Sequence, residues 1–142
     1  MLTSARNEFP GKVTAIQEGA VNDEIELTLA GGDRIVAVIT RQSTLALGLK
    51  IGSEAIALVK APWVILAAPE SRIRLSTRNR LQGVVREVNV GAVNTEVILD
   101  LQGGNTLAAI ITQDSATSLG LAAGKPLLAF FKASHVIIGV TS

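Results

Sequence analysis

The order of hydrophobic and polar residues along the chain predicts short β-strands separated by glycine turns. Residues 24–29 alternate strictly between polar and apolar side chains, which is typical of a strand with one buried and one solvent-facing side. Gly31-Gly32-Asp33 follows, and its glycines accept the positive φ angles that tight hairpin turns need. Residues 34–40 then form an apolar, β-branched run, as expected of a central strand.

A short helix is expected after this run. Thr40 is a suitable N-cap for a helix that reaches Leu47, and Gly48 would end it in the left-handed conformation. Further strands are predicted at 11–16, 55–59 and 64–67, and a second set follows at 97–101, 107–112, 127–131 and 136–140. Five short strands and one helical turn in so few residues favour a small barrel of the OB type. We therefore predict an all-β protein of two tandem OB-like five-stranded small barrels, each with one short helix.

The two halves of the chain are copies of one unit. The tetrad Ser4-Ala5-Arg6-Asn7 returns as Ser76-Thr77-Arg78-Asn79, a shift of 76 − 4 = 72 positions. At this shift roughly 27 of 65 aligned positions are identical without a gap. The predicted domains are residues 1–68 and 76–142, joined by a polar, charged connector at 69–75. Each is near the lower size limit for an adequate core, so we expect them to pack on each other, on further subunits, or both.

Few polar residues are the same in both copies. The identical charged pairs are Arg6 with Arg78, Glu24 with Glu96, and Lys60 with Lys132. Identical uncharged polar pairs include Asn22 with Asn94, Thr40 with Thr112, and Ser43 with Ser115. A structural ion pair is one explanation for the charges. Each copy keeps two cations and one carboxylate, however, so at least one cation has no repeated partner and is either solvated or available to an anion.

The chemistry of these segments favours an anion. Serine hydroxyl, asparagine amide, lysine and arginine groups all donate hydrogen bonds, and charged donors suit a small oxyanion. Small neighbours such as Ala5 and Ala61 leave backbone N–H groups open to a ligand. The segment Gly19-Ala20-Val21-Asn22 can also curve around a ligand, but glycine and asparagine equally favour a plain turn.

In combination these motifs resemble the Mop domains of molybdate-binding proteins, the molbindins. The resemblance rests on Ser-Ala-Arg-Asn near the start, Gly-Ala-Val-Asn after the first strand, and Lys-Ala-Ser before the last strand, which is intact only in the second copy. It covers nearly the whole chain. It implies a di-Mop molbindin that binds molybdate or tungstate, needs no other cofactor, and forms a homotrimer with a ring of six Mop units.

The resemblance also implies two classes of oxyanion site. The first joins the tetrad to the lysine segment across an interface between units; it carries over onto Ser4, Ala5, Arg6, Lys60 and Ala61, and onto Ser76, Thr77, Arg78, Lys132, Ala133 and Ser134. The second lies near the threefold axis; it uses Gly19, Ala20, Val21 and Asn22, and Gly91, Ala92, Val93 and Asn94.

Two substitutions set the copies apart from each other. Pro62 stands where the second copy has Ser134, and proline offers neither a hydroxyl nor a backbone N–H. Thr77 replaces the alanine of the first tetrad and adds bulk and a hydroxyl. We therefore expect the two interface sites to differ in affinity, with the site that uses Pro62 the weaker one.

Composition narrows the class of protein. The chain is 48% hydrophobic and 18% charged with a formal net charge of +1, which suits a compact soluble fold and gives no electrostatic case for nucleic acid or a membrane. It has no cysteine, so disulfides and thiol chemistry are excluded. No leader and no apolar run of membrane-spanning length is found, and a cytoplasmic protein is expected.

Three alternatives remain open at this point. An OB-fold nucleic-acid binder would combine a basic groove with stacking aromatics, but aromatics are only 3% of this chain. We do not expect an enzyme, because His135 is the sole histidine and has no counterpart in the first copy. The same units also resemble molybdate-sensing parts of regulators and transporters, whereas the predicted role is intracellular molybdenum storage or homeostasis.

Overall fold

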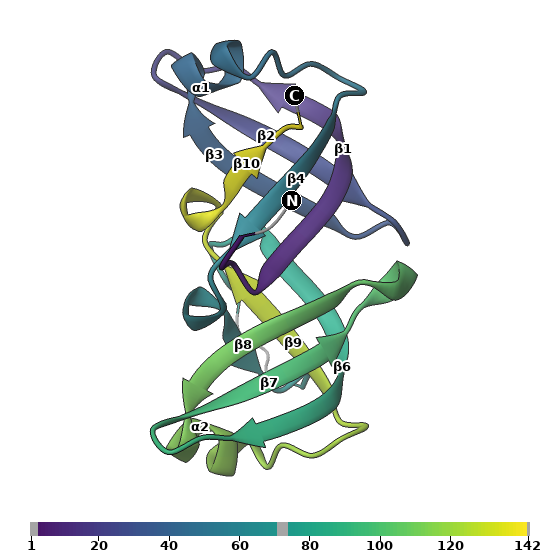
Figure 1. Ribbon diagram of the computed structural model, residues 1–142, viewed down its shortest axis with the longest axis vertical. Helices are drawn as coiled ribbons and strands as arrows, with labels where there is room; N and C mark the ends of the chain where they lie inside the picture. Colours follow the sequence, from purple (N-terminus) through teal and green to yellow (C-terminus); the bar gives the residue numbers. More distant parts are fainter. Residues whose placement is uncertain (1–2, 71–73, 142) are drawn as a thin grey trace.

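The computed structural model describes residues 3–70 and 74–141 and contains two five-stranded antiparallel sheets, one above the other in Figure 1. The first repeat supplies β1 (Asn7–Gln17), β2 (Asn22–Leu29), β3 (Arg34–Thr40), α1 (Arg41–Ala46), β4 (Glu54–Val59), η1 (Ala61–Trp63) and β5 (Ile65–Ala67). The second supplies β6 (Asn79–Val90), β7 (Asn94–Asp100), η2 (Gln102–Gly104), β8 (Thr106–Thr112), α2 (Gln113–Leu119), β9 (Pro126–Phe131), η3 (Ala133–His135) and β10 (Ile137–Gly139). Of the connector predicted at 69–75, residues 71–73 lie outside the described residues.

The strands follow the predicted alternation. In β2, Ile25, Leu27 and Leu29 are buried while the residues between them are half-buried. β1 is longer than the predicted 11–16, because its first half pairs with β4 and its second half with β2. A register shift between Val13 and Ala15 marks the change, as β-bulges often do where a sheet curls.

The two short helices begin where the sequence places them. The Thr40 hydroxyl accepts a hydrogen bond from the Ser43 N–H at 3.1 Å, and the Thr112 hydroxyl accepts one from the Ser115 N–H at 3.1 Å. Gly48, just past α1, has a φ of 64°, so the left-handed residue predicted at the end of this helix is confirmed.

The last strand of each repeat is exchanged. The strand orders are β10-β4-β1-β2-β3 and β5-β9-β6-β7-β8, so each sheet takes its fifth strand from the other repeat. Ile138 of β10 lies opposite Ala57 of β4, and Leu66 of β5 lies opposite Ala129 of β9. In Figure 1 the yellow β10 accordingly lies beside β4 in the upper half of the molecule. Because β10 also contacts β3 and β5 contacts β8, each sheet curls into the predicted OB-like barrel.

Two buried asparagines also join the repeats. Asn7 donates to the Ala108 carbonyl at 2.8 Å and accepts from the Ala108 N–H at 2.7 Å. Asn79 makes the same pair of bonds to Val36, both at 2.7 Å. The last residue of each tetrad is therefore committed to structure, since both ends of its amide are already used.

The hydrophobic core runs through both repeats. Phe9 and Phe131 are among its largest buried side chains, and buried residues of both repeats form one cluster. This agrees with the expectation that units of this size pack on each other. Within the described residues, no helix has the length and apolar character needed to cross a membrane.

Candidate functional site

The tetrad and the lysine segment of one repeat meet at the end of the same ladder. β1 and β4 pair as far as Asn7 opposite Val59, so Arg6 and Lys60 are the next residues on the two strands. β6 and β9 end in the same way, with Asn79 opposite Phe131. Backbone pairing thus places the lysine segment of the same repeat beside each tetrad. The expected contribution of a lysine segment from another unit stays a prediction.

Each tetrad is held by a threonine hydroxyl, in two different ways. Thr77 donates to the Phe131 carbonyl at 2.5 Å, so the extra hydroxyl of the second tetrad already has an acceptor. In the first tetrad the Ala5 N–H donates to the Thr3 hydroxyl at 3.1 Å. Ser4 and Ser76 are exposed beside these contacts.

The two tetrad arginines pair with glutamates of the opposite repeat. Arg6 Nη1 lies 2.5 Å from Glu96 Oε2, and Arg78 Nη1 pairs with Glu24 Oε1. The repeated arginine and the repeated glutamate therefore form the ion pair that was one explanation for the repeated charges. Of the three repeated charged residues, the lysine is the one that these two ion pairs do not use.

Lys60 and Lys132 are the cations that this pairing leaves uncompensated. Both are exposed, and neither forms an ion pair with another residue in the described part of the chain. Lys60 Nζ lies 5.3 Å from the centre of the Trp63 ring, a weak cation–π contact. Trp63 in turn stacks on His135, with ring centres 4.5 Å apart. The two lysine segments thus approach each other where the repeats meet.

The 3₁₀ turns η1 and η3 follow the two lysines. The first N–H groups of such a turn have no partner within the turn. In η3 these groups belong to Ala133 and Ser134, whereas in η1 Pro62 has no N–H to offer. Ala61 is buried, so its methyl group packs inside while the start of the turn stays near Lys60.

Ser134 is brought to the opposite repeat. It lines a pocket with Asn22, Thr40 and Ser43, next to apolar side chains of β3 and β10. The Thr40 hydroxyl donates to Ser43 Oγ at 2.8 Å, which leaves the Ser43 hydrogen free to donate into the pocket. Residues from the two predicted site classes, Ser134 and Asn22, therefore share one pocket within the chain.

The two Gly-Ala-Val-Asn loops are exposed and are closed by different chemistry. In the first, Asp23 accepts from the Gly19 N–H at 3.0 Å and lies 3.5 Å from Arg41 Nη1. The Gly19 bond is the main cause that holds the pKa of Asp23 below its ordinary value, while burial acts in the opposite direction.

The second loop is closed without charges. The Gly91 N–H donates to the Asn94 carbonyl at 2.9 Å, and Gln113 Nε2 donates to the Gly91 carbonyl at 2.7 Å. At both tips the valine is strongly exposed, with Val21 at 72% and Val93 at 79%. Both repeats thus present an apolar side chain at the equivalent position of the loop.

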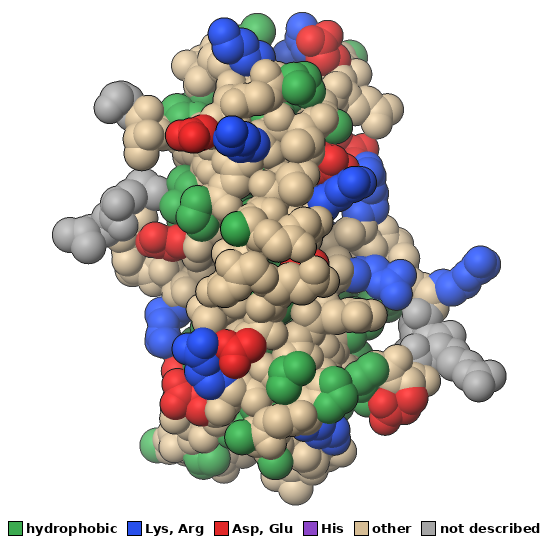
Figure 2. All heavy atoms as spheres, turned by 90° about the vertical axis from the view of Figure 1, so that its right-hand side faces the viewer, with side chains coloured by type: hydrophobic (Ala, Val, Ile, Leu, Met, Phe, Trp, Pro, Cys, Tyr) green, Lys and Arg blue, Asp and Glu red, His purple; other side chains and the backbone are tan. Residues whose placement is uncertain are grey.

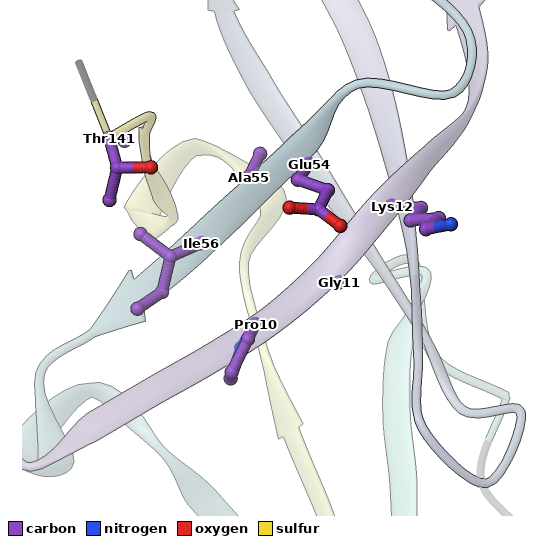
Figure 3. Close-up of a pocket in the computed structure, with 8 residues that line it drawn as sticks. Pro10, Gly11, Lys12, Glu54, Ala55, Ile56 and Thr141 are labelled. Atoms are coloured by element: carbon purple, nitrogen blue, oxygen red, sulfur yellow. The ribbon is translucent and has the colours of Figure 1, made fainter.

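A further pocket lies on the outer side of β1 and β4. Figure 3 shows Pro10, Gly11 and Lys12 on β1 beside Glu54, Ala55 and Ile56 on β4, with Thr141 near the chain end. A pocket at the equivalent strands of the second repeat is lined by Gln82, Gly83, Val84 and Pro126 among others. None of the described residues that line these pockets belongs to the predicted oxyanion sites, so they lie outside the candidate site.

Two pairs of functional candidates were not assigned to a site from sequence. These are Thr40 with Ser43, which line the pocket of Ser134, and Glu24 with Glu96, which hold the tetrad arginines. The signal that could have found them is their identity in both copies. No group of three or more histidine, aspartate or glutamate side chains suited to a metal ion occurs among residues 3–70 and 74–141.

The surface charges are mixed. On the face drawn in Figure 2, lysine and arginine side chains alternate with aspartate and glutamate, and green apolar patches lie between them. This face therefore has no continuous basic stripe of the kind that follows a nucleic-acid backbone.

Comparison with known proteins identifies both repeats. Residues 3–66 and 75–138 each match the TOBE domain. The chain is 49% identical over 140 residues to the molybdenum-pterin-binding protein MopA of Rhodobacter capsulatus, covering 99% of this chain and 53% of that protein. It is 38% identical over 137 residues to the DNA-binding transcriptional dual regulator ModE of Escherichia coli K12, covering 96% of this chain and 51% of the regulator. The chain thus spans about half the length of the curated relatives it matches.

A solved structure resembles the whole chain. It is that of the cytoplasmic molybdate-binding protein ModG with molybdate bound, at a TM-score of 0.96 and 48% identity, covering 99% of this chain and 100% of that one. The chain therefore belongs to the TOBE-domain family and, with two such domains in tandem, to the di-Mop molbindins.

Proposed function

We propose that this protein binds molybdate, and tungstate as a tetrahedral dianion of similar size, for intracellular storage or homeostasis of the metal. The observation that carries the proposal is the pair of exposed, uncompensated lysines, Lys60 and Lys132, at the strand ends beside the tetrads. The repeated arginine and the repeated glutamate neutralise each other in ion pairs. The repeated lysine therefore supplies the positive charge that an oxyanion needs.

The donors around each lysine suit such an anion. The tetrad with Ser76 and Arg78 ends on the strand beside Lys132, and the N–H groups at the start of η3 follow Lys132 in the chain. Together they would present hydroxyl, guanidinium, ammonium and backbone N–H hydrogens to several oxygens at once. The proposed residues are those predicted from sequence, in the two repeats at 1–68 and 76–142, and the loops at 19–22 and 91–94 form the second class of site.

The assembly proposed is a homotrimer. Support comes from the exposed valines Val21 and Val93 and from the exposed isoleucines Ile65 and Ile137, which occupy equivalent positions in the two repeats. Apolar side chains repeated in this way fit the symmetric interfaces of a closed ring. Such an assembly would bring the Gly-Ala-Val-Asn loops of several copies together around an axis.

We further propose that the protein is cytoplasmic and acts as a binder, without catalysis and without nucleic acid as a partner. His135 is stacked against Trp63, and its Nδ1 has no hydrogen-bond partner among the described residues, so this histidine is not paired with a nucleophile through Nδ1. The formal net charge of +1 and the mixed charges on the face drawn in Figure 2 support a partner other than nucleic acid.

A molybdate-sensing role is the second candidate. The similarity to about half of the regulator ModE of Escherichia coli supports it, because the same paired units could report molybdate to an attached or separate partner. Gel filtration of a mixture with a DNA-binding or transporter subunit would detect such a partner, whereas storage requires none.

The decisive experiment is calorimetric titration of the purified protein with molybdate, tungstate and sulfate, together with its mass in solution. We expect saturable binding of molybdate and tungstate, weaker binding of sulfate, and a mass three times that of the chain. Absence of molybdate and tungstate binding would refute the proposed function, and a monomeric mass would refute the trimer alone.

A further inference from the structure

Each tetrad arginine is held by a carboxylate that belongs to the other repeat. Arg6 Nη1 is 2.5 Å from Glu96, and Arg78 pairs with Glu24 through the same guanidinium nitrogen. The duplication kept this arginine and this glutamate in both copies while most other charges changed. A pair that only added stability would not need to be repeated, because exposed ion pairs contribute little to folding.

The two partners of each pair differ in burial. The arginine side chains are 54% and 58% exposed, whereas the glutamates Glu96 and Glu24 are only 20% and 34% exposed. Glu96 also accepts a hydrogen bond from Asn89 Nδ2 at 3.3 Å. A partly desolvated carboxylate that lost its cation would be costly, so an arriving anion is not expected to displace the glutamate.

Each tetrad arginine has enough N–H donors to bind its glutamate and an oxyanion at the same time. A guanidinium carries five N–H donors in a planar fork, and the glutamate engages the group at Nη1. More than half of each arginine side chain stays open to solvent, and each arginine directly precedes the last ladder pair, as the lysine follows it on the neighbouring strand. An oxyanion can therefore use the free donors while the glutamate keeps the guanidinium in place.

We propose that Glu24 and Glu96 are positioning residues, which orient Arg78 and Arg6 for the oxyanion; this inference rests on the proposed function. Because each glutamate belongs to the opposite repeat, each site is complete only when the two repeats are docked. Glu24 and Glu96 also lie two residues after the asparagine with which each Gly-Ala-Val-Asn segment ends, so the arginine of one predicted site class is linked to the loop of the other.

Electrostatics alone predicts the opposite effect of removing the glutamate. Loss of a negative charge near an anion site strengthens anion binding. A positioning role instead predicts weaker binding, because the guanidinium loses its fixed orientation. The sign of the change in affinity therefore distinguishes a residue that orients Arg78 from one that competes with the ligand or takes no part.

The test is calorimetric titration of the full chain with sodium molybdate, for wild type, Glu24→Gln and a matched control. Glu26→Gln is the control, since Glu26 lies on the same strand and the same side, loses the same charge, and contacts the Thr14 hydroxyl at 2.8 Å. We expect affinity to fall about tenfold at the Arg78 site in Glu24→Gln, a loss typical of orienting partners, and to stay the same or rise slightly in Glu26→Gln. Glu96→Gln repeats the test independently at Arg6.

A double-mutant cycle separates positioning from a general structural effect. If Glu24 acts through Arg78, adding Glu24→Gln to Arg78→Gln causes no further loss, whereas independent effects would add. Additive losses, or molybdate binding by Glu24→Gln as tight as that of wild type or tighter, would overturn the inference. Wild type that fails to bind molybdate would refute the proposed function itself, so the two failures are distinguishable.

Discussion

Asp33 and Asn105 occupy equivalent positions in the hairpins of the two repeats (105 − 33 = 72) and differ mainly in charge. Asn105 Nδ2 donates to the Ala30 carbonyl at 2.9 Å and to the Gln102 carbonyl at 3.1 Å. Asp33 Oδ2 is buried without a partner among the described residues. Burial raises the pKa of Asp33 above its ordinary value of 3.8, while the backbone of Gln102 acts in the opposite direction.

Asp33→Asn is therefore expected to stabilise the protein at neutral pH. A carboxyl whose pKa is higher in the folded state destabilises that state once it is ionised, above its folded pKa. The gain, of about 0.5 kcal/mol, should fall as the pH drops through the folded pKa and vanish below the unfolded value. Urea unfolding of both proteins at several pH values measures it, and a gain that persists in strong acid would contradict this cause. The reciprocal Asn105→Asp should destabilise at neutral pH.

At the scale of elements, the turns η1 and η3 occupy equivalent places in the two repeats but differ in the hydrogen-bond donors that they offer. Both follow a lysine and both pack on the sheet edge of the opposite repeat, η1 on β8 and η3 on β3. Ser134 of η3 reaches the pocket of Asn22, Thr40 and Ser43, whereas Pro62 offers no donor at the equivalent position. The difference in affinity expected between the two interface sites therefore has a local cause, and it stays a prediction.

Ser134→Ala should weaken molybdate binding at one class of site about tenfold, the effect of losing one hydrogen bond to a charged ligand. Pro62→Ser should strengthen binding at the other class. Titration calorimetry resolves both effects as changes in affinity and stoichiometry, with Ser118→Ala on the exposed side of α2 as the control. Equal affinities and stoichiometries in wild type and Ser134→Ala would show that Ser134 takes no part.

At the scale of the whole molecule, the repeats are joined by exchanged strands, by the asparagine bridges and by their hairpins. Gly31 of the first hairpin and Gly103 of η2 approach so closely that side chains do not fit. A Cβ on Gly103 would lie 2.2 Å from the Ala30 carbonyl oxygen, whereas one on Gly104 would meet nothing within 4 Å. Gly103 and Gly104 have left-handed φ angles of 68° and 80°.

Gly104→Ala and Gly103→Ala form a matched pair that measures this contact. Both variants force alanine into the left-handed region, which costs about 1 kcal/mol. Gly103→Ala additionally pushes the hairpins apart and should cost about 2 kcal/mol more in the free energy of unfolding. Urea denaturation monitored by Trp63 fluorescence compares the two. Equal losses would mean that the hairpins do not pack tightly in solution.

The local structure was largely predictable from the sequence. The alternation at 24–29, the cap at Thr40 and the glycine turns all depend on residues close together in the chain, and the structure agrees with them. The duplication also showed that one of the two repeated cations has no repeated carboxylate, because counting the repeated charges needs no coordinates, but only the ion pairs of the structure identify it as the lysine. The tetrad was harder, since Asn7 and Asn79 proved to be buried links between the repeats.

The sequence by itself determined the repeat, the strands, the caps and the set of repeated charges, since these follow from periodicity and residue chemistry. Only the tertiary structure decided which partner each group takes. Residues 65–67 and 137–139 carry nearly the same pattern and fit the edge of either sheet, so no local preference distinguishes their own repeat from the other. The partners of Arg6 and Arg78 follow from that choice, because long-range docking alone brings each arginine to the opposite glutamate.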